Sequence, residues 1–152
     1  MLIARLCQVF DQFDVPYALV GGHAVALHGA VRGTVDVDVV IEWRREVLER
    51  AVAALESLGL RSSLPLVAGD VFEHRDRYLE ERNLVAWNFV DHDNPLHQVD
   101  LLINFDLSGH VVANIHTAFG ELRVLNKQDL IEMKRASGRP QDLEDIRALE
   151  SL

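Results

Sequence analysis

Three aspartates are the residues of this chain best suited to chemistry. Asp36 and Asp38 are separated by one residue within an apolar run, and Asp100 lies in a second apolar run much later in the sequence. Residues at i and i+2 of a strand point to the same side, with Cα atoms roughly 6.5–7 Å apart. Two such carboxylates can bind the same divalent ions, and a third from another strand would complete the oxygen ligands that Mg²⁺ prefers. We therefore predict Asp36, Asp38 and Asp100 as metal ligands.

A glycine pair precedes the first two acids by about fifteen residues. Gly21 and Gly22 end the apolar run of residues 17–20, which predicts a buried strand entering a tight turn. A helix over residues 23–29 would begin at this turn, and its first amides could approach a phosphate closely because the glycines carry no side chain. A Gly-Gly turn or an acidic strand face is ordinary by itself. Their order along one chain favours a nucleotide site.

Hydrophobic spacing predicts the elements that must position these residues. Apolar residues recur at intervals of three and four in several segments, which predict helices over residues 2–13, 45–58, 127–136 and, after a Gly-Arg-Pro break, 142–149. Short or alternating apolar runs predict strands over residues 17–20, 35–42, 84–90 and 98–105, the last two paired as a hairpin. Residues 60–83 are expected to hold one short strand and irregular structure.

Composition limits the class of protein. The 152 residues suit one domain, which we place at 1–152, and their hydrophobic content is sufficient for a core. A net charge of −9 argues against broad binding to DNA, because phosphates are neutralised by clustered Lys and Arg. No apolar run approaches the roughly 20 residues of a membrane helix, and no signal peptide is evident. We expect a soluble, cytoplasmic protein with no membrane partner, in which the lone Cys7 belongs to the core.

These motifs together resemble the DNA polymerase beta-like nucleotidyltransferase superfamily. Its pattern of apolar strand, Gly-Gly, acid-x-acid strand and later third acid is similar to LVGGHAVALHGAVRGTVDVDVVIE followed by QVDLLI. The chain is also similar to a small branch that includes the AbiE-type toxin nucleotidyltransferases, through Arg32 and Thr34 before the acid pair and through LIEMKRASGRPQDLEDI near the end. The resemblance covers nearly the whole chain.

The resemblance implies an α/β (α+β) fold with a central mixed sheet flanked by helices. It further implies Mg²⁺ or Mn²⁺ as cofactor and transfer of a nucleoside monophosphate from a nucleoside triphosphate to a hydroxyl group. Carried over by position, Asp100 would also be the base, or would orient the base, for that hydroxyl. The residues implied to contact the nucleotide are Gly21, Gly22, His23, Arg32, Thr34, Lys134 and Arg139, with Asp142 shaping the same wall.

Several alternatives stay open from the sequence. The acceptor could be RNA, a protein or a small molecule, and a cognate antitoxin or a second copy of the chain are further candidate partners. A non-catalytic nucleotide-binding module is the main competing interpretation, because His23 stands where many active relatives have Ser. Asp91, His92, Asp93 and His97 could suggest a metal cluster, but the turn around Asn94-Pro95 explains their composition.

Overall fold

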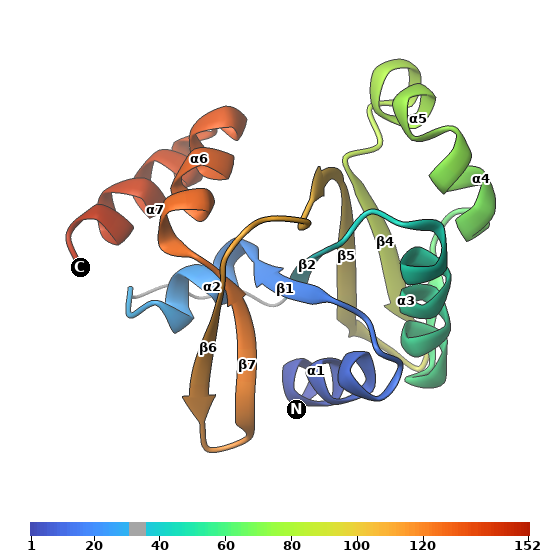
Figure 1. Cartoon of the computed structure of the whole chain (residues 1–152), viewed down its shortest axis with the longest axis horizontal. Helices are drawn as coiled ribbons and strands as arrows, with labels where there is room; N and C mark the ends of the chain where they lie inside the picture. Colours follow the sequence, from blue (N-terminus) through green and yellow to red (C-terminus); the bar gives the residue numbers. More distant parts are fainter. Residues whose placement is uncertain (31–35) are drawn as a thin grey trace.

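The structure, a computed structural model, describes residues 1–30 and 36–152 (Figure 1). Its helices are α1 (Leu2–Gln12), α2 (Gly21–Leu27), α3 (Arg45–Ser57), α4 (Ala68–Glu73), α5 (Arg75–Arg82), α6 (Lys127–Ser137) and α7 (Pro140–Glu150). Its strands are β1 (Tyr17–Val20), β2 (Val37–Ile41), β3 (Leu60–Ser62), β4 (Ala86–Asp91), β5 (Asn94–Asp106), β6 (Val112–Thr117) and β7 (Gly120–Leu125).

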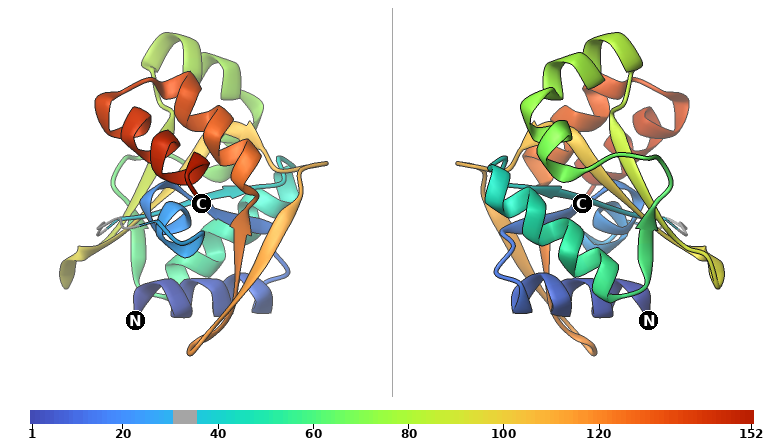
Figure 2. Two further views of the ribbon diagram at one scale, coloured as in Figure 1. Left: turned by 90° about the vertical axis from the view of Figure 1, so that its left-hand side faces the viewer. Right: turned by 90° about the vertical axis from the view of Figure 1, so that its right-hand side faces the viewer.

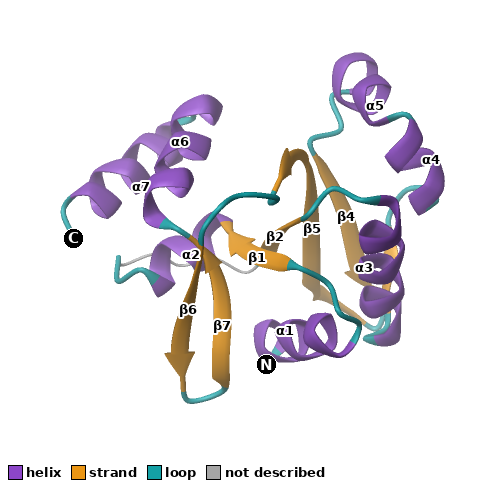
Figure 3. Cartoon of the chain, in the orientation of Figure 1, coloured by secondary structure: helices purple, strands orange, loops and turns teal. Residues whose placement is uncertain are grey.

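The strands of the described residues form one mixed sheet in the order β3-β4-β5-β2-β1-β7-β6. The pairs β2/β5 and β1/β7 are parallel, and the remaining neighbours are antiparallel. All four residues of β1 are buried, whereas β2 and β5 carry Asp38 and Asp100 on one face of the sheet. Figure 3 shows this mixture of helices and strands, and the predicted α/β class with a mixed sheet is confirmed.

The helices lie in separate groups around the sheet. Figure 2 views the molecule from its two ends and shows α6 and α7 side by side at one end, with α4 and α5 at the other. Helices α1 and α3 contact each other, and their buried faces include Leu6, Phe10, Leu48 and Leu55. None of the helices in the described ranges is both long and apolar enough to cross a membrane.

Most predicted elements are present, with shifted ends. Helix α2 begins at Gly21 and not at residue 23, so the glycine pair forms its first turn. Strand β5 begins at Asn94, which makes the hairpin turn after Asp91 tighter than expected. The predicted break before residue 142 is shorter, because Pro140 is the first residue of α7, where its missing N–H costs no helical hydrogen bond.

The prediction for residues 60–83 was wrong beyond its one strand, because the segment also contains α4 and α5. Helix α5 buries none of its residues, so local hydrophobic spacing could not indicate it. Tertiary contacts hold it: the Arg75 side chain donates a hydrogen bond of 2.6 Å to the Ile103 carbonyl and lies 4.7 Å from the Trp43 ring. Trp43 in turn stacks on Phe72 of α4.

The hairpin of β6 and β7 lies in residues 106–126, for which the sequence analysis predicted no element. Leu122 and Val124 alternate into the core from β7, but β6 is an edge strand without a buried residue. The hairpin is held in the sheet because β7 pairs with β1. The hydrophobic pattern of neighbouring residues does not predict this contact between distant segments.

Candidate active site

The acidic residues of the site lie in a row across neighbouring strands. Strands β2 and β5 pair in parallel with Asp38 directly opposite Asp100. On the outer sides of this pair, Asn88 of β4 is opposite Asp100 and Val20 of β1 is opposite Asp38. Residues opposite one another in a sheet point to the same face with Cβ atoms about 4.5–5.5 Å apart. The register therefore places two carboxylates side by side, although 62 positions separate them in the sequence.

The charge of one carboxyl group affects the ionisation of the other. Burial of Asp38, and next to it the charge and hydrogen bond of Asp100, raise the pKa of Asp38 to about 7; the Asp36 charge adds to this, and Lys134 opposes it. Like charges this close cannot both ionise without a proton or a cation to compensate them. At neutral pH the pair therefore binds a proton readily.

Gly21 brings backbone directly against this pair. Its φ of +69° lies in the left-handed region that favours glycine. A Cβ at this position would lie 2.9 Å from Asp38 Cγ and closer still to Asp38 Oδ2. The carboxylate thus occupies the space that a side chain would fill, so the start of α2 and the acid pair form one continuous surface.

A cleft of about 930 Å³ opens over this surface. Its floor comes from β2, β4 and β5, and one wall is the side of α6 followed by the start of α7. Its lining includes Gly21, Gly22, Asp36, Asp38, Asp100, Leu102, Asn104, Phe105, His110, Asp129, Glu132, Met133, Lys134, Arg139 and Asp142. The structure thereby brings together seven of the ten residues predicted for the site, and Asp142 with them.

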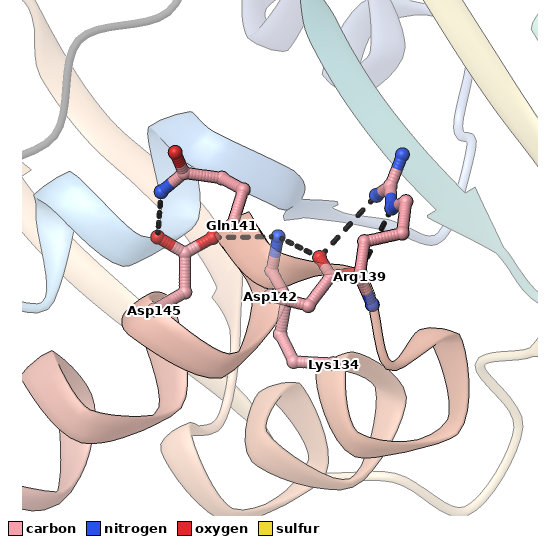
Figure 4. Close-up of polar contacts among 5 residues, drawn as sticks. All are labelled: Lys134, Arg139, Gln141, Asp142 and Asp145. Carbon is pink, nitrogen blue, oxygen red and sulfur yellow. Dashed lines mark hydrogen bonds and ion pairs between the residues drawn. The ribbon is translucent and has the colours of Figure 1, made fainter.

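Lys134, on the α6 wall, is held by two carboxylates of α7 (Figure 4). Its Nζ lies 3.0 Å from Asp145 Oδ2 and 3.3 Å from Asp142 Oδ1, and its side chain is only 10% exposed. Gln141 donates a hydrogen bond of 3.0 Å to the other oxygen of Asp145. These two ion pairs hold the Lys134 amine in place on the wall of the cleft.

Arg139 and Asp142 cap the N-terminus of α7. Asp142 accepts hydrogen bonds from the Arg139 backbone N at 3.2 Å and from Arg139 Nε at 2.8 Å. Burial alone would raise the pKa of Asp142, but the Arg139 hydrogen bonds and the Lys134 charge together outweigh burial and lower it. Asp142 therefore stays ionised, and the Arg139 side chain, 74% exposed, lies at the mouth of the cleft.

Two predicted nucleotide ligands, Arg32 and Thr34, lie outside the described residues. His23 is described, but the structure does not bring its side chain to the cleft. Successive helical residues turn by about 100°, so position 23 faces away from position 21. Its ring lines a separate apolar pocket of about 410 Å³ with Leu2, Leu27 and Phe119. The His23 side chain, where many active relatives have Ser, is therefore turned away from the acids. Any contact of residue 23 with a nucleotide would come from its backbone.

Other groups in and beside the cleft were missed by the sequence analysis. Asn88 of β4 donates a hydrogen bond of 2.9 Å to Asp100 Oδ1. His110 Nδ1 lies 2.7 Å from Asp129 Oδ2, and Asn126 caps α6 by accepting from the Asp129 backbone N. The Asn126 cap could have been recognised as an Asn directly before a helix. Nothing in the local sequence indicates Asn88 or His110.

The residues present fit a divalent cation in part. In residues 1–30 and 36–152, no three His, Cys, Asp or Glu side chains are arranged closely enough to hold a metal ion as they stand. Two carboxylates do lie side by side, at Asp38 and Asp100, and Asp36 lines the same cleft. Carboxylate oxygens with open space beside them suit Mg²⁺, which retains waters and binds substrate phosphates. Asp38 and Asp100 would hold such an ion, with Asp36 at its edge.

The mixed sheet, paired acids and glycine turn agree with the nucleotidyltransferase class that the sequence predicts. The sequence matches, over residues 1–151, the family described as a nucleotidyltransferase of unknown function (DUF6036). The chain belongs to this family, and the protein is therefore an enzyme of the transferase class. A search of the curated proteins finds no match.

Solved structures share the fold at low sequence identity. ANT(2″)-Ia in complex with adenylyl-2″-tobramycin is 15% identical, with a TM-score of 0.64 over 97% of this chain and 85% of that chain. The lincosamide antibiotic adenylyltransferase LnuA, bound to lincomycin, is 14% identical, with a TM-score of 0.63 over 95% and 91%. A nucleotidyltransferase-like protein from Paracoccidioides brasiliensis is 16% identical, with a TM-score of 0.62 over 97% and 73%.

Proposed function

We propose that this protein transfers a nucleoside monophosphate from a nucleoside triphosphate, with Mg²⁺ or Mn²⁺, to a hydroxyl group of a small-molecule acceptor. The observation that carries the proposal is the row of Asp38 and Asp100 against the backbone of Gly21, on the floor of a cleft large enough for a nucleotide and an acceptor. Metal ions bound at the aspartates would stabilise the charge that develops on the phosphate oxygens.

Residues of the chain carry out the remaining steps of the transfer. The acceptor oxygen forms a bond to the α-phosphorus while the bond from that phosphorus to the bridging oxygen breaks, and pyrophosphate leaves with the electron pair. Asp100 takes the proton of the acceptor hydroxyl, directly or through water. Gly21 and Gly22 hold the phosphates by backbone N–H groups, and Lys134 and Arg139 place positive charge on the opposite wall.

A small acceptor agrees with the charge of the cleft. Its described lining contains several carboxylates, including Asp129 and Glu132 away from the acid pair, whereas Lys134 and Arg139 are already paired with Asp142. An RNA strand would meet this surface and a net charge of −9 unfavourably. ANT(2″)-Ia with adenylyl-2″-tobramycin and LnuA with lincomycin are folds of this kind with small antibiotics bound.

Label transfer tests the proposal. The purified protein is incubated with each α-labelled nucleoside triphosphate and Mg²⁺ or Mn²⁺, and with a hydroxyl-bearing small-molecule panel, total RNA or protein lysate as acceptor. Label should move to a small molecule with wild type and not with Asp38→Ala. Transfer to RNA or protein alone would overturn the proposed acceptor class. Metal-dependent nucleotide binding without any transfer would favour the non-catalytic module.

We propose a biological setting from the resemblance to the AbiE-type toxin nucleotidyltransferases. Arg32, Thr34 and the segment 130–146 support the AbiE-type branch, and with it a role in a toxin–antitoxin or defence pair in the cytoplasm, carried by a single domain over 1–152. Expression of the chain should then slow growth in a way that Asp38→Ala abolishes. A wild type that leaves growth unchanged at high expression would remove this setting without affecting the transfer reaction.

A further inference from the structure

Asn88 is linked to Asp100 without lining the cleft. The two residues are directly opposite in the antiparallel pair of β4 and β5. Asn88 Nδ2 donates a hydrogen bond of 2.9 Å to Asp100 Oδ1 and another of 3.1 Å to Gln98 Oε1. Since both partners are oxygen acceptors, the two hydrogens of one amide nitrogen are used, and the orientation of this amide is determined.

The amide of Asn88 is itself fixed from the hairpin. Gln98 accepts from Asn88 through Oε1, and its Nε2 donates a hydrogen bond of 3.0 Å to the Pro95 carbonyl. A continuous chain of hydrogen bonds therefore runs from the start of β5, at Pro95, to one oxygen of Asp100. A carboxylate with one oxygen held in this way cannot rotate freely, and Asp38 lies directly opposite Asp100 on the neighbouring strand.

We propose that Asn88 is a positioning residue, which orients the Asp100 carboxylate and keeps it available as a cation ligand beside Asp38. The proposal rests on the proposed function, because it assigns Asp100 to metal and acceptor. Removal of a residue that hydrogen-bonds to a metal ligand commonly weakens metal binding by about 10–100-fold.

The chain offers matched variants for the test. Asn88→Ala removes both hydrogen bonds, whereas Gln98→Ala removes only the support behind Asn88 and should have a smaller effect. Val90→Ala is the structural control, because Val90 lies two residues from Asn88 on the same face of β4 and is opposite Gln98, not Asp100. Any loss of strand stability common to the three variants is measured by thermal unfolding.

The readout is binding of Mn²⁺ alone to the whole chain, followed by electron paramagnetic resonance and by calorimetry. We expect Asn88→Ala to weaken Mn²⁺ binding about 10–100-fold, Gln98→Ala to weaken it less, and Val90→Ala to leave it unchanged. In label transfer, kcat of Asn88→Ala should fall while KM for the nucleotide changes little.

The outcomes separate the two proposals. Mn²⁺ binding by Asn88→Ala equal to wild type would overturn the positioning role and leave the proposed function intact. Equal weakening in Asn88→Ala and Val90→Ala would overturn it as well, because a general loss of strand structure would then explain the result. A wild type that binds no Mn²⁺ would overturn the proposed function, and the positioning role with it.

Discussion

Gly21→Ala should damage the site out of proportion to its effect on the fold. The new Cβ would lie 2.9 Å from Asp38 Cγ, where ordinary contacts begin at 3.4 Å, and closer still to the carboxylate oxygen. The Asp38 Cγ must therefore move by roughly 0.5 Å, and its oxygen further, to restore normal contact distances. A displacement on the order of 1 Å of a catalytic group can reduce the rate about 100-fold.

Gly59→Ala is the matched control. Gly59 has a φ of +85°, in the same left-handed region as Gly21, but a Cβ there would meet nothing within 4 Å. A non-glycine residue in this region costs about 1–2 kcal/mol, and 1 kcal/mol corresponds to about 2–4 °C in Tm for a domain of this size. Gly59→Ala should therefore lower Tm by roughly 2–8 °C with full activity.

Gly21→Ala carries the same backbone cost and adds the displacement of Asp38. An off-rotamer side chain costs about 0.5–1.5 kcal/mol, so the total loss should be roughly 1.5–3.5 kcal/mol. Thermal unfolding and label transfer are measured in parallel, and transfer should fall about 100-fold in Gly21→Ala alone. Wild-type transfer by Gly21→Ala, or an equal loss of transfer in Gly59→Ala, would refute the direct contact between residue 21 and Asp38.

Three further predictions concern the charged groups. Lys134→Met should destabilise the fold by about 3–5 kcal/mol, because it leaves Asp145 buried without its cation and removes one of the two cations that bind Asp142; urea unfolding checks this, and adding Asp145→Asn should recover part of the loss. Asp38→Asn should raise Tm at pH 8 while abolishing transfer, since the raised native pKa of Asp38 means that its ionised form destabilises the fold above an unfolded pKa of about 3.9; an unchanged or lower Tm would contradict the raised pKa that burial and the Asp100 charge give Asp38. Asp142 has a lowered native pKa, so its stabilising effect is complete above about pH 4 and is lost as pH falls through the native value. The stability difference between wild type and Asp142→Asn should accordingly be largest at pH 7 and shrink below pH 4, and a difference that stays constant would refute this.

Local sequence determined the elements whose hydrophobic spacing is strong. The strand over residues 17–20 and the helix over residues 45–58 were predicted almost to the residue, because their apolar side chains repeat with the period of the element they form. The sequence also predicted the acidic strand faces, because Asp38 and Asp100 interrupt apolar strands. By itself such a face is ordinary, and only its order with the glycine pair along the chain favoured a nucleotide site.

Tertiary structure decided which residues share a surface. No local pattern contains the parallel register that sets Asp38 opposite Asp100, or the antiparallel register that sets Asn88 beside it. Helices α4 and α5 also escaped prediction, because α5 buries none of its residues and is held by Arg75 against β5 and Trp43. The partners of Lys134 emerged only when α7 packed against α6. Hydrophobic period is a property of neighbouring residues, whereas register and ion pairing depend on contacts between distant segments, which exist only after the chain has folded.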